Sequence, residues 1–433
     1  MLNGTQGEAM PEQPPYKSFP FHTPRPSGAP LALAGLRILD FTRYLAGPWC
    51  TQTLADMGAE VIKIEAVGTG DETRSFQPPD VDGEAPYFIG LNRNKKSLCL
   101  NLASQGGVSV VMDLVAAADV IVENFSPGVM SRLGLDYDSL KAVRPDLIYC
   151  AITAYGSDSS YAGQPGFDSV FQAESGFASL TGEPDRLPMR TGSPVVDIAT
   201  SMNATSAVLG ALVARERLGV GQYVEVSMFD TAVTLLGYQP MNYLASGEDP
   251  VRQGNTAPVA TPIGMFETAE GGAIYVSCGS QRSWVALAEH VLDRPDLVEH
   301  PDYADNRARN RNRDALMGLI AEIFLSRPRD HWLRKAFEGR VPIGAVRTVG
   351  EALDAPLARE RSLVTRIARD EGGEVPNIAS PFRFSETPVA EPVPAPRLNA
   401  DAETVLKGML GYDAARLDAL SESGAFDAPQ KTD

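Results

Sequence analysis

The stretch RILDFTRYLAGPWCTQTLADMGAEVIKIE (37–65) decides the fold class. Its first six residues, 37–42, form an apolar run typical of a strand, and EVIKIE (60–65) is a second such run. The segment between them is helix-like and carries Pro48, which a first helical turn accommodates. Strand, helix and strand in this order predict a βαβ unit with parallel strands.

The same alternation continues along the chain. Strand-like runs recur at KSLCLNL (96–102), DVIVENF (119–125) and LIYCAITAY (147–155), with helix-like segments at 107–117 and 127–143 between them. We therefore predict an α/β fold in which the first ~155 residues form a doubly wound parallel sheet.

A second architecture is expected after residue 227. The apolar segment 197–218 predicts a long helix that stops at Gly219. Farther on, in GMFETAEGGAIYVSC (264–278), apolar and polar residues alternate on both sides of a Glu-Gly-Gly turn, a pattern typical of a β-hairpin. A helix-rich segment then leads to VPIGAV (341–346), a buried-strand candidate. We expect a smaller α+β domain here.

Composition narrows the class of protein. A chain of 433 residues is too long for one compact core, so two domains are expected. Hydrophobic residues make up 43% of the chain, and no window approaches the ~20 apolar residues that a membrane span needs. A formal net charge of −17 opposes nonspecific binding to nucleic acid. We expect neither a membrane nor a nucleic acid as partner.

The N-terminal sequence and the cysteines indicate a cytoplasmic protein. Residues 1–30 contain seven prolines and lack the basic start and apolar run of a signal peptide, so they predict a flexible extension. The four cysteines are isolated in sequence, without a C-x-x-C pair, as is typical of reduced cytosolic thiols.

Several motif-bearing enzyme classes are disfavoured. No G-x-G-x-x-G string follows the first strand, and the chain has no P-loop, H-E-x-x-H or G-x-S-x-G string and no Cys/His cluster with metal-ligand spacing. We expect no metal site. Because 23–289 contains no histidine, acid–base chemistry in that stretch must use carboxylates, Lys or Tyr. The candidate carboxylates, each of which could instead be a cap or a solvated charge, are Asp168, Asp185, Asp197 and Asp230.

Two polar segments could hold an anionic ligand. The basic cluster 93–96 suits a phosphate, although a solvated charged turn explains it equally well. The segment 124–128 follows a strand, at the crevice edge where open α/β sheets bind ligands, although an Asn-capped turn without a ligand is an equal alternative.

Nine strings along 31–425 resemble, in their order and spacing, family III CoA-transferases, the formyl-CoA transferase/CaiB-BaiF-like family. They are LDFTRYLAGP (39–48), GAEVIKIE (58–65), GDETR (70–74), LNRNKKS (91–97), VENFSPG (122–128), RLGLDYDSL (132–140), PGFD (165–168), TGEPD (181–185) and GVGQYVEVSMFD (219–230).

The resemblance implies a Rossmann-like large domain built from both chain ends, an inserted smaller α+β domain and an interlocked homodimer. The predicted division is a flexible Pro-rich extension (1–30), the first part of the large CoA-binding domain (31–205), a linker helix (206–226), the small domain (227–315), a second linker (316–340) and the second part of the large domain (341–433).

The resemblance also implies a catalytic residue. The family's nucleophilic aspartate lies in a G-x-x-D loop, which here is Gly182 to Asp185. A carboxylate, ionised at neutral pH, can attack an acyl-CoA thioester, expel CoA and form a mixed anhydride. The thiolate then gives an aspartyl-CoA thioester, which passes CoA to a second carboxylic acid. The expected substrates are an acyl-CoA and a free carboxylic acid, and no tightly bound cofactor is expected.

For CoA itself, the resemblance points to ten contact residues. They are Leu45, Ala46, Leu91, Asn92, Arg93, Asn94, Asn124, Phe125, Arg132 and Tyr155. One departure from the family pattern is Ala66, where a basic residue often follows KIE, and Arg43 or Arg74 could substitute.

Two alternatives remain within this resemblance. The family includes 2-methylacyl-CoA racemases, which pair a histidine with an aspartate about thirty residues on; Asp197 matches the aspartate, but Phe167 stands at the histidine position. The second alternative is a catalytically silent CoA-binding protein. As for substrate, APVATPIG (257–264) replaces the glycine run of the oxalate subgroup, which disfavours oxalate and suits a C4–C5 dicarboxylic acid such as mesaconate or succinate.

Overall fold

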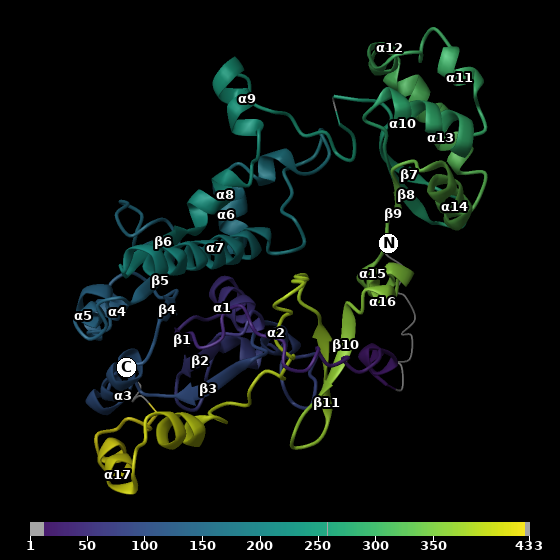
Figure 1. Ribbon diagram of the computed structural model, residues 1–433. Helices are drawn as coiled ribbons and strands as arrows, with labels where there is room; N and C mark the ends of the chain where they lie inside the picture. The colour runs from purple at the N-terminus through teal and green to yellow at the C-terminus, as the bar shows by residue number, and fades with distance from the viewer. Residues whose placement is uncertain (1–12, 258, 429–433) are drawn as a thin grey trace, which may run out of the picture. The chain divides into compact units, whose positions relative to one another are not determined.

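The computed structural model describes residues 13–257 and 259–428. It divides into two compact units (Figure 1). The first unit combines the chain up to Ser175, the segment Gly192–Leu236 and the chain from Pro356 onward, and the second unit comprises Gly176–Thr191 and Gly237–Ala355. Segments from both halves of the chain therefore build the first unit.

A six-stranded parallel sheet forms the centre of the first unit, in the order β3-β2-β1-β4-β5-β6. This is the strand order of a Rossmann-like sheet, with its reversal between β1 and β4. The first five strands were predicted from sequence, whereas the sixth was not. The strands are β1 (Arg37–Asp40), β2 (Glu60–Glu65), β3 (Lys95–Cys99), β4 (Val120–Glu123), β5 (Ile148–Thr153) and β6 (Gln222–Ser227).

Helices cover both faces of the sheet because successive strand residues point to opposite sides. Ile38 of β1 packs in a core cluster with residues of α1 (Ala46–Asp56) and α7 (Val195–Leu218). Its neighbour Leu39 belongs to the other cluster, with α3 (Gln105–Val115). The first unit also contains α2 (Pro86–Leu91), α4 (Val129–Arg132), α5 (Tyr137–Lys141), α6 (Asp168–Glu174), α8 (Met228–Thr234), α16 (Pro356–Glu360) and α17 (Ala414–Glu422).

Helix α7 confirms one prediction and corrects another. It ends at Gly219, whose φ of 70° closes the helix as expected. By length and composition alone, however, α7 could cross a membrane, contrary to the sequence-based expectation that no segment is apolar enough. Its residues Ala204 and Val208 are fully buried in the same core cluster as α1, as befits a core helix.

The C-terminal segment covers the edge strand β3. The side chains of Asn399 and Asp401 accept hydrogen bonds from the backbone N–H groups of Cys99 and Ser97, at 2.8 and 2.9 Å. The N–H of Asp401 donates to the carbonyl of Ser97 at 3.1 Å. The last strand edge on this side is thereby supplied with hydrogen-bond partners from the far end of the chain.

Residues 13–22 pack against a two-stranded antiparallel sheet of β10 (Val364–Ala368) and β11 (Glu374–Ile378). Phe21 forms a parallel bridge with Arg366, whose N–H donates to Pro20 and whose carbonyl accepts from His22, both at 2.9 Å. Phe19 is buried. Within the predicted flexible extension, residues 13–22 therefore contact this sheet, and residues 1–12 lie outside the described chain.

The second unit contains the predicted hairpin, β7 (Ile263–Glu267) and β8 (Ala273–Ser277), with positive φ at Glu270 in its turn. VPIGAV does form a strand, β9 (Ile343–Ala345), but β9 pairs with β8 and does not mark the return to the large domain. The helices of this unit are α9 (Gln239–Ser246), α10 (Gln281–Ala286), α11 (Asp296–Glu299), α12 (Asn306–Arg311), α13 (Arg313–Phe324), α14 (Arg329–Gly339) and α15 (Val349–Leu353).

Candidate active site

A cavity of about 470 Å³, here called the switch-point cavity, lies in the first unit. It is at the carboxyl ends of β1, β4 and β5, next to the reversal of strand order, where open α/β sheets bind ligands. Its lining includes four stretches: Tyr44–Ala46 after β1, Asn124–Pro127 after β4, Ile152–Ala154 at the end of β5, and 162–168. It is completed by Phe76, Tyr87, Asp197 and Met228. Four predicted CoA contacts, Leu45, Ala46, Asn124 and Phe125, meet here.

Asn124 ties the loop after β4 to the loop after β1. Its Oδ1 accepts a hydrogen bond from the N–H of Arg43, and its Nδ2 donates to the carbonyl of Arg43, both at 2.9 Å. The Arg43 guanidinium lies 4.8 Å from the centre of the Phe125 ring, a cation–π contact. The two loops are thus fixed together by a side chain that also lines the cavity.

A buried ionic network supports the loop after β1. Lys95 Nζ contacts Asp40 Oδ2 at 2.9 Å, and Lys63 Nζ donates to the carbonyl of Thr42 at 2.6 Å. Burial lowers the pKa of Lys95 to about 8, although Asp40 opposes this. Burial alone would raise the pKa of Asp40, but the ammonium groups of Lys95 and Lys63 hold it well below its usual value. Lys95 of the predicted phosphate-binding cluster is therefore engaged inside the protein.

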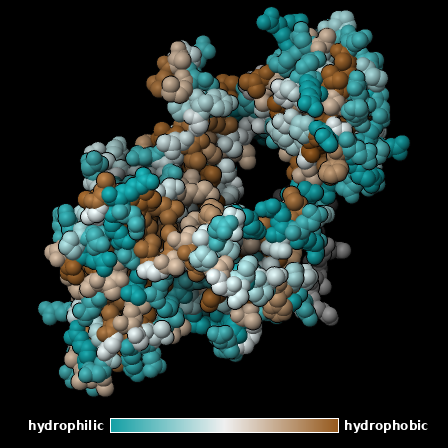
Figure 2. All heavy atoms as spheres, in the orientation of Figure 1, coloured by the Kyte–Doolittle hydropathy of each residue, from teal (hydrophilic) through white to brown (hydrophobic). Residues whose placement is uncertain are grey.

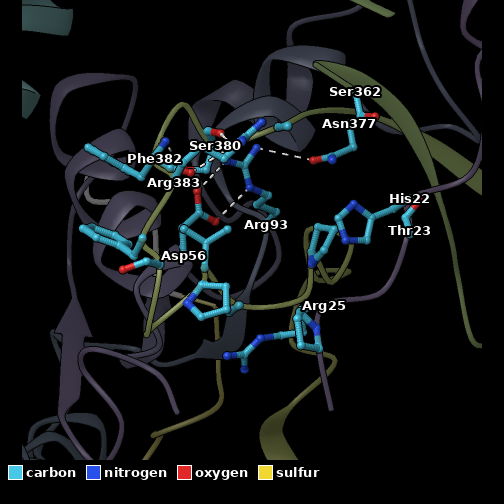
Figure 3. Close-up of a pocket in the computed structure, with 18 residues that line it drawn as sticks. His22, Thr23, Arg25, Asp56, Arg93, Ser362, Asn377, Ser380, Phe382 and Arg383 are labelled. Atoms are coloured by element: carbon cyan, nitrogen blue, oxygen red, sulfur yellow. Dashed lines mark hydrogen bonds and ion pairs between the residues drawn. The ribbon is translucent and has the colours of Figure 1, made fainter. Parts of the chain in front are cut away.

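The structure separates the predicted contacts at 91–94 from the switch-point cavity. Leu91 and Asn92 are buried, and Asn94 donates to Asp56 at 3.0 Å. Arg93 binds the Asp56 carboxylate through two nitrogens at 2.9 and 2.5 Å. In Figure 3 its guanidinium points toward Asp56 and Asn377, in a different cavity of about 420 Å³.

Two further predicted contacts, Arg132 and Tyr155, are not among the described residues that line the switch-point cavity. Arg132 is exposed in the last turn of α4. Tyr155 donates its hydroxyl to Glu174 at 2.7 Å and packs against Phe171, with ring centres 5.1 Å apart.

Two of the four candidate carboxylates named from the sequence, Asp168 and Asp197, line the cavity. Asp168 begins α6 and accepts hydrogen bonds from the N–H of Val196 at 2.8 Å and from Gln172 at 2.6 Å. Burial, together with the negative charge of Asp168, raises the pKa of Asp197 to about 7. Phe167 also lines the cavity, 63% exposed.

Asp185 belongs to the second unit, on a loop that follows a short 3₁₀ turn, Ala178–Leu180. Its side chain is exposed. The N–H of Met189 donates to the carbonyl of Thr181 at 3.0 Å and closes the loop on itself. Gly182 has a φ of 110°, a conformation that a residue with a side chain rarely adopts. The loop therefore presents a free carboxylate on a defined backbone.

A family model described as CoA-transferase family III matches residues 33–402, most of the chain. The chain belongs to this family. The resemblance found in the sequence is thereby confirmed, and the protein is a family III CoA-transferase, an enzyme that moves CoA from an acyl-CoA to a free carboxylic acid.

Relatives of this family III CoA-transferase are matched over most of their length. The succinate–glutarate CoA-transferase of Agrobacterium fabrum is 36% identical over 86% of this chain and 94% of its own. The succinyl-CoA:mesaconate CoA-transferase of Haloarcula marismortui is 37% identical over 88% and 97%. A crystal structure of a CAIB/BAIF family protein from Brucella suis, 37% identical, superposes with a TM-score of 0.80 over 88% of this chain and 100% of the other.

Among residues 13–257 and 259–428, no three His, Cys, Asp or Glu side chains are grouped as metal ligands. The four cysteines are buried and unpaired, as expected from their isolated positions in sequence.

Proposed function

We propose that this CoA-transferase exchanges CoA between succinyl-CoA and a C4–C5 dicarboxylic acid such as mesaconate or glutarate, as a cytoplasmic homodimer. The observation that carries the CoA part of the proposal is the meeting of Leu45, Ala46, Asn124 and Phe125 at the switch-point cavity. The substrate class rests on the names of the relatives from Agrobacterium fabrum and Haloarcula marismortui, together with the APVATPIG segment.

The start of α1 suits the phosphates of CoA. This helix has eleven residues, begins at Ala46 inside the cavity lining, and carries no side-chain cap. Its first N–H groups and the positive end of its dipole can therefore bind an anion. The apolar side chains of Leu45 and Phe125 supply contacts for the pantetheine arm. In this proposal Arg93 has a structural role, because its guanidinium donates two hydrogen bonds to the Asp56 carboxylate.

We assign the chemistry to Asp185 in four steps. A carboxylate oxygen of Asp185 attacks the thioester carbonyl of the donor, the C–S bond breaks, and CoA leaves as a thiolate. The thiolate attacks the aspartyl carbonyl of the resulting anhydride and releases the donor acid as its carboxylate. The acceptor carboxylate then attacks the aspartyl-CoA thioester and expels the thiolate. Finally the thiolate attacks the acceptor carbonyl, which yields the new acyl-CoA and restores Asp185.

Exposed apolar side chains support the homodimer. Met202, Val213 and Leu218 on α7 are 59%, 51% and 72% exposed, and brown surface lies over this helix in Figure 2. On α9, Met241 and Leu244 are 67% and 73% exposed. Surfaces of this kind are typical of protein interfaces.

The racemase alternative lacks a base. Asp197 lines the cavity with a pKa of about 7, which suits proton transfer, but Phe167 stands where the partner histidine is expected. A phenyl ring cannot accept a proton, so a two-base mechanism cannot operate through this pair.

The test is trapping of the acyl intermediate. The intact protein is incubated with succinyl-CoA, quenched with hydroxylamine or borohydride, and mapped by peptide mass spectrometry, beside an Asp185→Asn variant. We expect modification confined to the Asp185 peptide and absent from the variant. Acceptors are then compared by rate, with mesaconate and glutarate expected to exceed oxalate. Normal turnover by Asp185→Asn would refute the nucleophile, and deuterium exchange at C2 of an acyl-CoA without an adduct would favour the racemase.

A further inference from the structure

One guanidinium in the second unit binds the loop that carries Asp185. Arg252 donates only to backbone carbonyls there, all in the segment 179–186. Its Nε donates to Glu183 at 3.2 Å and its Nη1 to Ser179 at 3.5 Å, and its Nη2 donates to Arg186 at 2.7 Å and to Pro184 at 3.5 Å.

The two carbonyls that share Nη2 belong to the residues immediately before and after Asp185. The backbone on both sides of the carboxylate is thus held by one nitrogen atom. Asp185 itself is exposed, so its position depends on this backbone and not on packing of its side chain. Only a planar group with several donors in fixed directions can bind four carbonyls at once.

Gly254, two residues after Arg252, also contacts the loop, at its first residues. The N–H of Gly254 donates to the carbonyl of Gly182 at 3.1 Å. The Glu183 carboxylate lies against Gly254, so close that a Cβ there would be 2.5 Å from Glu183 Oε2. Arg252 and Gly254 together therefore contact the three residues that precede Asp185 in the G-x-x-D turn and the residue that follows it.

We propose that Arg252 is a positioning residue, which holds Asp185 in the geometry needed to attack the thioester. The proposal rests on Asp185 as the nucleophile. Nucleophilic attack depends steeply on placement, and a misplacement of about 1 Å can cost about 100-fold in rate. The guanidinium of Arg252 is bound by backbone carbonyls of the loop, so loss of this side chain should lower the rate of acylation and leave acyl-CoA binding unchanged.

The experiment compares Arg252→Ala and Arg252→Lys with Arg329→Ala. Arg329 is a matched control in the same unit, since it donates to the carbonyl of Val346 at 3.1 Å and pairs with Glu351 at 2.9 Å. For each variant, single-turnover acylation of Asp185 by succinyl-CoA is followed by mass spectrometry, with kcat, KM, the melting temperature and hydrogen exchange of the 177–189 peptide.

We expect Arg252→Ala to slow acylation and kcat about 100-fold, with KM for succinyl-CoA changed less than about threefold. Lysine keeps the positive charge but lacks the planar arrangement of donors of a guanidinium. The acylation rate of Arg252→Lys should therefore stay below about a tenth of the wild-type rate. Hydrogen exchange should rise in the 177–189 peptide in both variants. The control should keep its acylation rate.

Normal acylation in folded Arg252→Ala, or full recovery by lysine, overturns the positioning role. If the alanine variant does not fold, the lysine variant decides by the same two readouts, acylation rate and loop exchange. Failure of the nucleophile assignment is distinguishable, because the wild-type protein would then carry no adduct on the Asp185 peptide at all.

Discussion

The side-chain amide of Asn124 holds the backbone of Arg43 through both of its ends, as acceptor from the N–H and donor to the carbonyl. These residues lie in loops that follow β4 and β1, on the two sides of the strand-order reversal. One amide therefore sets the distance between the two loops that line the switch-point cavity.

Replacing this amide should weaken CoA binding. Asn124→Ala removes both hydrogen bonds, and we expect a loss of about 1–3 kcal/mol in the free energy of unfolding and a clear rise in KM for acyl-CoA. Asn124→Asp can still accept a hydrogen bond from the N–H of Arg43 but cannot donate one to its carbonyl. Its KM for acyl-CoA should therefore lie between the KM of the wild type and that of Asn124→Ala. Urea denaturation and steady-state kinetics measure both effects. If the KM of Asn124→Ala were unchanged, the contact between Asn124 and Arg43 would not be needed for CoA binding.

Glu123 should make stability depend on pH. Burial raises its pKa to about 7 from 4.5, and Glu225 adds to the rise, while the N–H of Phe125 opposes it. The folded state then binds a proton more tightly than the unfolded state, so this contribution to stability is present below about pH 4.5 and is lost as pH rises through 7. The loss is about 3 kcal/mol.

Glu123→Gln removes this titration. Relative to the wild type, the variant should gain about 3 kcal/mol between pH 4.5 and pH 8, as measured by urea unfolding at several pH values. Glu225→Gln is the comparison variant. It removes the smaller repulsion from Glu123 and also the titration of Glu225 itself, whose lowered pKa acts in the acid range, so most of the loss through pH 7 should remain. Parallel pH profiles for wild type and Glu123→Gln would contradict the raised pKa.

The Asp40–Lys95 pair should be costly to break from one side. Both side chains are fully buried and 2.9 Å apart. Asp40→Asn leaves the Lys95 ammonium without its carboxylate, and we expect about 3–5 kcal/mol of destabilisation. The double variant Asp40→Asn with Lys95→Met removes the orphaned charge and should recover part of this loss. Thermal and urea unfolding of the single and double variants measure these effects. If the destabilisation of the double variant equalled the sum of those of Asp40→Asn and Lys95→Met, the two residues would not be coupled.

Gly254→Ala should leave kcat nearly unchanged, because its Cβ would meet only the carboxylate end of Glu183, an exposed side chain that can rotate away. Gly247→Ala is a matched control: Gly247 also has positive φ, 74° against 55°, but nothing lies within 4 Å of a Cβ there. Both variants carry the backbone cost of a left-handed alanine, about 1 kcal/mol. Both variants should therefore lose a similar amount of stability and keep kcat, as measured by urea unfolding and steady-state kinetics. A loss of kcat confined to Gly254→Ala would show that the Glu183 side chain cannot move without disturbing Asp185.

The sequence predicted those parts of the fold that depend on local pattern. EVIKIE was predicted as a strand and is β2 to the residue, because its apolar residues and bounding turns are local signals. Strand β6 was missed because its residues Gln222–Ser227 are only partly buried and mix polar with apolar side chains. The 127–143 segment, predicted as one amphipathic run, forms two short helices, α4 and α5.

Site residues were harder to predict because ion pairs join distant parts of the chain. Arg93 and Lys95 read as an exposed basic cluster, and nothing local reveals that Asp56 and Asp40 neutralise them inside the protein. Asp168 and Asp197 were recognised as carboxylates, but their meeting in one cavity depends on how α6 and α7 pack. The assignment of Asp185 stays a prediction from its motif.

The cover on β3 has a consequence for the newly made chain. Asn399 and Asp401, which bind the edge strand, are translated about 300 residues after it. Until then, a ribosome-bound chain that has already assembled β1 to β6 exposes an open strand edge, which is a template for pairing with another chain. Premature termination before residue 399 would therefore yield a product that is prone to aggregate. Chaperone contacts would be most useful until the segment with Asn399 and Asp401 has been synthesised.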